Sequence, residues 1–265
     1  MLNANGFEAW ITIDGGDVQH FQPEIVGDPA GVTCWIASEV NKGFAIHWRN
    51  TDVFCQTGGR VWVDGNECPG EIIQGPNLEA VVSGRRTSGS TMAPFVFSPL
   101  DLTDDDAFLD STAHQNIGLV RLEVWRINQT GTKPYPGAAP VADSKIHERS
   151  KKGVAHQIKF GEAVEGVPRL AAVFDYMDRV PVVTFSFKYR SLDILRANGI
   201  APCKRKAVTS PEPGPSGVAK QEAKSGPKVK RVKKEGGAAG SFTPGEIIDL
   251  TRSVSPAFPE VIDLT

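Results

Sequence analysis

The chain has 265 residues, of which 40% are hydrophobic and 23% are charged, the composition of a globular protein with one or two domains. Its formal net charge of −2 is an average over segments of opposite sign. No apolar run reaches the roughly eighteen residues that a membrane-spanning helix needs, and the first residues lack the basic start and apolar core of a signal peptide. These features exclude a membrane as partner and predict a protein that stays inside the cell.

The first 190 residues predict β structure. Apolar and polar residues alternate from Phe7 to Ile13, and this run ends at the turn residues Asp14-Gly15-Gly16. Further short runs, each separated from the next by turn residues, cover residues 32–36, 45–48, 61–63, 95–97, 120–124 and 183–189. The run at 61–63 is followed by Asp64-Gly65, which is a strong signal for a two-residue hairpin.

Short strands in this number, with almost no helix between them, predict a mainly β fold. We expect an antiparallel, jelly-roll-like β-sandwich over residues 1–200. A short terminal helix is predicted from Ser191 to Asn198, with Ser191 as N-cap and Gly199 as the stop. Long loops are expected at residues 83–93 and 128–142, where a binding surface would most naturally lie.

Several blocks in this segment carry a family resemblance. They are Gly6-Phe7-Glu8-Ala9-Trp10, Thr33-Cys34-Trp35-Ile36, Ser83–Thr87 continuing to Pro94–Ser98, Leu102–Asp106, Val120–Trp125 and His147–Lys152. With them, residues 1–200 resemble an uncharacterised domain family of mushroom-forming (basidiomycete) fungi, known only as a domain of unknown function. The resemblance implies no activity and no catalytic residues.

No catalytic or metal-binding arrangement is evident in these 200 residues. The five histidines are scattered, and His147, in a basic stretch, is expected to face solvent. The cysteines Cys34, Cys55, Cys68 and Cys203 show neither close pairing nor Cys-x-x-Cys spacing, which disfavours disulfides and a zinc site. We therefore predict no enzymatic activity, metal or cofactor. An enzyme whose site is assembled from distant residues is the alternative.

Charge divides the chain into three parts. Residues 1–199 carry a net charge of −6, and within them Arg85-Arg86 and Arg149-Ser150-Lys151-Lys152 would form an anion-binding surface only if their segments met; ordinary surface charge is favoured. Between Ile200 and Gly240, ten lysines and arginines oppose three acids, and large apolar residues are few. We predict that residues 201–240 are a basic disordered linker and that residues 241–265, with a net charge of −3, are a separate tail.

The linker contains a dense basic cluster. Its cations are Lys228, Lys230, Arg231, Lys233 and Lys234. The cluster resembles a monopartite nuclear localisation signal, which implies a nuclear import receptor as partner and the nucleus as location. A solubilising or nucleic-acid-binding tail is the alternative. Val232-Lys233-Lys234-Glu235 also resembles a SUMO acceptor site, which makes Lys233 a candidate for modification.

A pentapeptide recurs near the C-terminus. Glu246 precedes Ile247-Ile248-Asp249-Leu250-Thr251, and Glu260 precedes Val261-Ile262-Asp263-Leu264-Thr265. Short aliphatic runs beside carboxylates suit strand addition to another protein's sheet edge. Both copies resemble SUMO-interacting motifs, which implies that Ile247, Ile248, Asp249, Leu250, Val261, Ile262, Asp263 and Leu264 bind SUMO.

Two other interpretations of the repeat stay open. Thr243-Pro244-Gly245-Glu246 fits a capping box and would open a short helix, although isolated helices of this length are marginal in water. Alternatively, both motifs dock on the β domain of their own chain.

Together these features predict a non-enzymatic nuclear interaction protein. It would bind SUMO or SUMO chains through its tail and present a β-sandwich whose ligand the sequence does not name. The alternative is a chromatin or nucleic-acid binder that acts through the basic linker.

Overall fold

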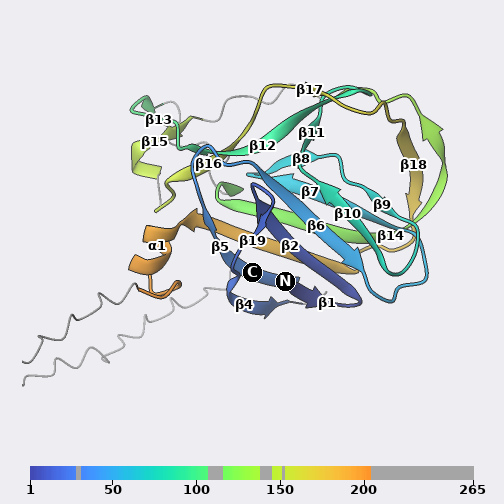
Figure 1. Ribbon diagram of the computed structural model, residues 1–265, viewed down its shortest axis with the longest axis horizontal. Coiled ribbons are helices and arrows are strands. Elements are labelled where there is room, and N and C mark those ends of the chain that lie inside the picture. Colours follow the sequence, from blue (N-terminus) through green and yellow to red (C-terminus); the bar gives the residue numbers. More distant parts are fainter. Residues whose placement is uncertain (28–30, 107–115, 138–144, 151–152, 204–265) are drawn as a thin grey trace, which may run out of the picture. The chain divides into compact units, whose positions relative to one another are not determined.

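The computed structural model describes residues 1–27, 31–106, 116–137, 145–150 and 153–203 (Figure 1). All of them belong to the first of the chain's two units, Met1–Ala207. The predicted tail lies outside the described residues, as does the linker from residue 204 onward.

Two sheets face one another. The first has the order β1 (Leu2–Ala4), β2 (Phe7–Ile13), β6 (Phe44–Asn50) and β10 (Leu78–Val82), with β3 (Gly16–Asp17) paired to β2. The second has the order β4 (Phe21–Val26), β5 (Gly31–Ser38), β19 (Val183–Ser191), β14 (Leu119–Lys133), β7 (Thr57–Val63) and β8 (Asn66–Cys68). In the second sheet, β18 (Ala171–Tyr176) also pairs with β14, and β9 (Ile72–Ile73) pairs with β7.

Two smaller sheets complete the β structure. One consists of β11 (Gly84–Arg86), β12 (Thr91–Pro99), β16 (His156–Phe160) and β17 (Val164–Glu165). An isolated bridge between Gly43 and Val96 links it to the first large sheet. The other pairs β13 (Leu102–Thr103) with β15 (Ile146–His147), which is followed by the 3-10 turn Glu148–Ser150.

The core lies between the two large sheets. Phe7 and Trp48 come from the first sheet and Phe185, Phe187 and Tyr189 from the second, and all five are fully buried in one cluster. Alternation along the strands sends these apolar side chains inward and leaves polar ones outside, as the sequence pattern predicts for a sandwich. The mainly β, sandwich-type fold is thus confirmed.

Aromatic contacts join the smaller sheet to this core. Phe44 stacks between Phe95 and Phe97, with ring centroids 5.2 and 4.5 Å away, and Phe97 lies 5.1 Å from the ring of Tyr189. Residues of β6, β12 and β19 therefore share one apolar interior.

Most strand pairs are antiparallel, as expected. The exceptions among the described strands are β5 with β19 and β13 with β15, which run parallel. Alternation in the sequence reports which face of a strand is buried, but it does not report the direction of the neighbour.

Three tight hairpins share one turn chemistry. The two-residue turns at Asn5-Gly6, Asp14-Gly15 and Asp64-Gly65 have both residues at positive φ, between 47° and 81°. Such turns match the right-handed twist of the flanking strands and favour Asn-Gly and Asp-Gly pairs. The hairpin predicted after residue 63 is confirmed: it joins β7 to β8.

The predicted terminal helix is present as α1 (Leu192–Ala197). Ser191 precedes it, but its side chain makes no capping hydrogen bond, and Gly199 has a φ of 68°. No helix in the described part of the chain is long and apolar enough to cross a membrane.

The two predicted loops are wrong in part. Residues 84–86 and 91–99 form the hairpin strands β11 and β12, and β14 continues as far as Lys133. Backbone pairing extends the strand predicted at residues 95–97 back to Thr91, and it forms β11 from the short polar run Gly84–Arg86, which has no alternation to mark it.

Candidate binding pocket

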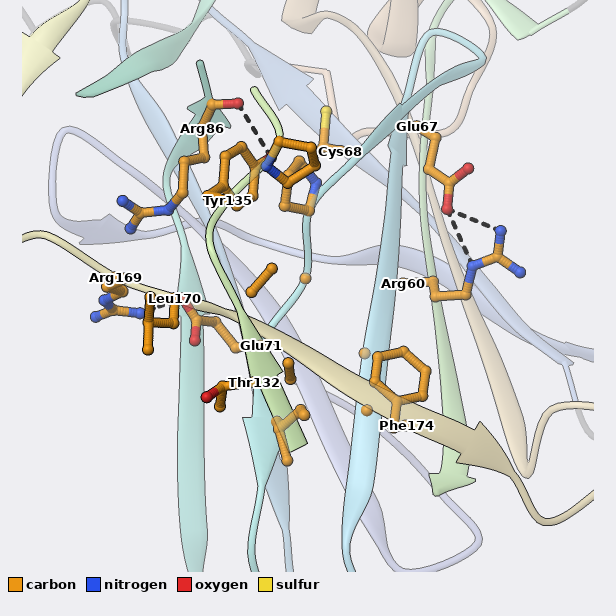
Figure 2. Close-up of a pocket in the computed structure, with 18 of the residues that line it drawn as sticks. Arg60, Glu67, Cys68, Glu71, Arg86, Thr132, Tyr135, Arg169, Leu170 and Phe174 are labelled. Carbon is orange, nitrogen blue, oxygen red and sulfur yellow. Dashed lines mark hydrogen bonds and ion pairs between the residues drawn. The ribbon is translucent and has the colours of Figure 1, made fainter. Parts of the chain in front are cut away.

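A pocket of about 750 Å³ opens beside the second sheet (Figure 2). Strands β7, β8, β9, β11, β14 and β18 all contribute to its wall, together with the segments at 69–71, 135–137 and 169–170. Both sequence segments in which a binding surface was expected, 83–93 and 128–142, thus supply lining residues.

The pocket forms where the long strand β14 extends past the end of its pairing with β7. Residues 120–126 of β14 pair with β7, whereas residues 127–133 pair with β18. A register shift between Gln129 and Gly131 interrupts the second ladder, and such bulges bend a strand. The β14–β18 pair is thereby carried beyond the sandwich core and forms one side of the pocket.

Positive charge dominates the lining. Four arginines are present, against two glutamates: Arg60, Arg85, Arg86 and Arg169 with Glu67 and Glu71. The lining side chains therefore carry a net charge of +2.

Two of the arginines are paired within the pocket. The Arg60 Nε and Nη2 atoms lie 3.1 and 2.8 Å from Glu67 Oε1, and Arg169 pairs with Glu71. In Figure 2 the Arg60–Glu67 pair lies on one side, and Glu71 and Arg169 lie on the other. These pairs leave the charges of Arg85 and Arg86 uncompensated by the acids of the lining.

Arg85 and Arg86 retain donors. Arg86 Nη1 donates to the carbonyl of Gly89 at 3.2 Å. The Arg85 guanidinium lies over the ring of Phe160, 5.6 Å from its centroid. The Arg85 Nε atom is buried and has no hydrogen-bond partner within the described structure.

Aromatic rings supply the apolar part of the wall. Tyr135, Phe174 and Tyr176 line the pocket, and the rings of Phe174 and Tyr176 meet edge to face at 5.4 Å. The Tyr135 hydroxyl donates to the Arg86 carbonyl at 3.3 Å. Burial raises the pKa of Tyr135, and Arg86 and Arg85 oppose this shift.

The pocket also contains a buried thiol. Burial raises the pKa of Cys68 to about 12, so this thiol is neutral at physiological pH. A neutral thiol is a poor nucleophile, and here it acts as part of the wall.

A smaller pocket of about 240 Å³ adjoins the first. The two share Pro69, Gly70, Glu71, Arg86 and Arg169. The pair formed by Glu71 and Arg169 is therefore a common wall between the two spaces.

A second polar cluster lies on the first sheet. His47 Nε2 is 3.0 Å from Thr12 Oγ1, and His47 Nδ1 is 3.1 Å from Glu79 Oε1. This is the connectivity of a nucleophile, its base and an orienting acid. However, Thr12 is only 8% exposed, Glu79 also binds Arg49, and neither pocket includes these residues. The cluster fits a structural hydrogen-bond network.

The site residues predicted from sequence lie elsewhere in the chain. The import cluster, the candidate acceptor Lys233 and both terminal motifs fall outside the described residues. Arg85 and Arg86 lie in the pocket, whereas Arg149 is not among the lining residues. Arg60 and Arg169, which complete the arginine set, carry no sequence motif and were missed.

The expectation for His147 was wrong. Its side chain is 6% exposed: Nδ1 accepts a hydrogen bond from the Arg149 backbone at 3.2 Å, and Nε2 lies 3.5 Å from Asp106. His147 belongs to β15 and pairs with Thr103 of β13, and its polar neighbours in the sequence gave no sign of this burial.

A family model described as a domain of unknown function, DUF7918, matches residues 6–204. No curated protein and no solved structure matches.

Proposed function

The chain belongs to the DUF7918 family, a domain of unknown function that covers residues 6–204, and on this premise we propose that it is a non-enzymatic nuclear interaction protein that binds SUMO through its tail. The family domain would act as a presented module, and the basic linker would direct import through Lys228, Lys230, Arg231, Lys233 and Lys234. From the resemblance of residues 1–200 to a domain family of mushroom-forming fungi, we also propose that the protein comes from a fungus.

The repeated motif carries this proposal. Residues 247–251 and 261–265 are nearly identical, and each copy follows a glutamate. An added strand gains backbone hydrogen bonds from a sheet edge, its alternate aliphatic side chains fill apolar pockets, and its carboxylates meet lysines at the rim. Two copies in a short tail are hard to attribute to chance, because one such pentapeptide is expected about once in a hundred thousand positions.

The basic linker supports a second candidate function. Its ten lysines and arginines against three acids would also hold a nucleic-acid backbone. Phosphate binding and aliphatic pocket binding differ in their response to salt, because only phosphate contacts release condensed counterions.

The test is a titration of SUMO into the full chain. We expect micromolar affinity, with at least a tenfold loss when Ile247, Ile248, Val261 and Ile262 are replaced by alanine, because the side chains that fill the apolar pockets are removed. In the matched control, alanine replaces Val208 and Val218, which are aliphatic residues outside the motifs. This control should bind SUMO with the affinity of the unaltered chain.

Equal affinity of the motif variant and the control would contradict SUMO binding by the tail. A parallel titration with duplex DNA separates the second candidate. Tight DNA binding that falls steeply between about 50 and 200 mM salt, together with absent SUMO binding, would favour the nucleic-acid function.

A further inference from the structure

We propose that the pocket between β7, β11, β14 and β18 binds a small organic anion, a carboxylate or phosphate monoester on a flat apolar body. This site is separate from the tail, and the inference does not rest on SUMO binding.

The charge of the pocket selects an anion. Glu67 and Glu71 neutralise Arg60 and Arg169, so the net charge of +2 comes from Arg85 and Arg86. A guanidinium offers a planar set of N–H donors that matches the oxygens of a carboxylate or phosphate.

Unused hydrogen-bonding capacity indicates the same class of ligand. Arg85 Nε is buried without a partner in the described structure, and Arg86 donates to one carbonyl there, that of Gly89. A buried donor without an acceptor is costly. Arg85 and Arg86 are consecutive in β11 and leave opposite faces of the strand, so an anionic oxygen would bind at one guanidinium, for which Arg86 has free N–H donors beside its bond to Gly89.

The remaining wall selects an apolar body. Tyr135, Phe174 and Leu170 supply apolar surface to the same lining as the arginines, together with Pro69 and Pro136. Aromatic walls favour flat apolar groups that stack or pack edge-on. The volume of about 750 Å³ falls within the roughly 300 to 1,000 Å³ typical of small-molecule sites.

The surroundings favour a small molecule over a polyanion. Residues 1–199 carry a net charge of −6, which repels an extended phosphate backbone. Glu67 and Glu71 also flank the space, so a second anionic group on the same ligand would meet a carboxylate. One anionic head on one apolar body is the arrangement that the lining fits.

The experiment uses three probes with one common body: 2-naphthoate, 2-naphthyl phosphate and the neutral 2-naphthalenemethanol. Each is titrated into the full chain by calorimetry. We expect both anions to bind and the alcohol to bind at least about tenfold more weakly, the size of one lost charge-assisted contact. The ratio of the affinities for 2-naphthoate and 2-naphthyl phosphate shows whether the pocket prefers a carboxylate or a phosphate as the head group.

A pair of variants locates the binding. Arg86→Gln should weaken both anions at least about tenfold and leave the alcohol unchanged. Lys42→Gln is the control, because Lys42 is an exposed cation paired with Asp14 and lies outside the pocket. Phe174→Leu should weaken all three probes by a similar factor, because it removes a ring that all three would contact.

Several results would overturn the proposal. Equal binding of the alcohol and the anions would show that charge is not recognised, and this comparison needs no variant. Equal losses in Arg86→Gln and Lys42→Gln would place binding elsewhere. Absence of binding by both anions at about 1 mM, where even weak specific ligands are detected, would reject this ligand class.

Discussion

Asp64 shows how one turn residue holds several strands together. Its carboxylate accepts hydrogen bonds from the Tyr189 hydroxyl at 2.7 Å, from the Ile158 backbone at 2.7 Å and from the Gly118 backbone at 2.9 Å. These donors belong to β19, to β16 and to the residue just before β14. The hairpin that joins β7 to β8 is thus tied to three other segments through a single side chain.

Replacing Asp64 with asparagine should destabilise the domain by about 2 to 3 kcal/mol. An amide has only one acceptor oxygen for these donors, and its NH2 group would point at the remaining N–H and O–H donors.

The loss of stability in this variant should depend on pH. Burial raises the pKa of Asp64 to about 6 from 3.8, although the hydrogen bond from Tyr189 opposes the shift. Between these values the folded protein binds the proton and the unfolded chain does not. The part of the stability that comes from this raised pKa is therefore fully present below about pH 4 and is lost as the pH rises through about 6, whereas the hydrogen bonds to Asp64 remain.

The measurement is urea unfolding of both proteins at pH 4 and pH 7, with a larger difference expected at pH 4. The pH dependence of the unaltered protein's stability does not isolate Asp64, because His20 changes stability with pH in the opposite direction. Burial lowers the pKa of His20 to about 4 from 6.5, so its contribution to stability is lost as the pH falls through that range. The same difference at both pH values would show that the pKa of Asp64 is not raised.

At the scale of elements, alternation predicts the strands of the core best. The run from Phe7 to Ile13 is β2 to the residue, and the run predicted from Val183 to Tyr189 is most of β19. Edge strands were missed because their burial is irregular. In β18, from Ala171 to Tyr176, no residue is fully buried, so no period of two marks it in the sequence.

Packing between elements depends on a glycine that alternation does not reveal. A Cβ atom on Gly59 of β7 would lie 2.5 Å from Cζ2 of Trp48, whose indole is fully buried on the facing sheet. The two sheets approach closely at this point because β7 carries no side chain there.

We expect Gly59→Ala to destabilise the domain by about 1 to 3 kcal/mol, because the indole must move within a packed core. Its neighbour provides a matched control: a Cβ on Gly58 would lie 3.4 Å from Cδ1 of Ile127, at the limit of ordinary contact, so Gly58→Ala should change stability much less. Thermal unfolding measures both. Adding Trp48→Phe to Gly59→Ala should cost less than the sum of the single changes, and strict additivity would argue against the clash.

At the scale of the molecule, the residues that line the pocket are distributed over the sequence, which hides the pocket from sequence analysis. Arg85-Arg86 stands out as a basic pair, but the pocket also needs Arg60, Arg169 and Tyr135, which come from three other stretches of chain. The pairing of β14 with β7 and β18 brings these stretches together, and a single sequence does not encode such long-range pairing in a readable pattern. Linear motifs are different, because their residues are contiguous in the sequence, and for this reason the partner proposed for the tail can be inferred without a structure.

The spacing of the two motifs adds a prediction about that partner. Eight residues, 252–259, separate them and can span at most roughly 26 to 29 Å, about the width of a small domain. Adjacent units of a SUMO chain would then be within reach of one tail, and the second contact would form at an effective concentration in about the millimolar range.

We expect a SUMO chain to bind the full-length protein at least about tenfold more tightly than a single SUMO. Replacing Ile247 and Ile248 with alanine should abolish this excess and leave monomer binding through residues 261–265. Calorimetric titration of both ligands measures the ratio, and equal affinity for chain and monomer would rule out bivalent binding while leaving single-site recognition intact.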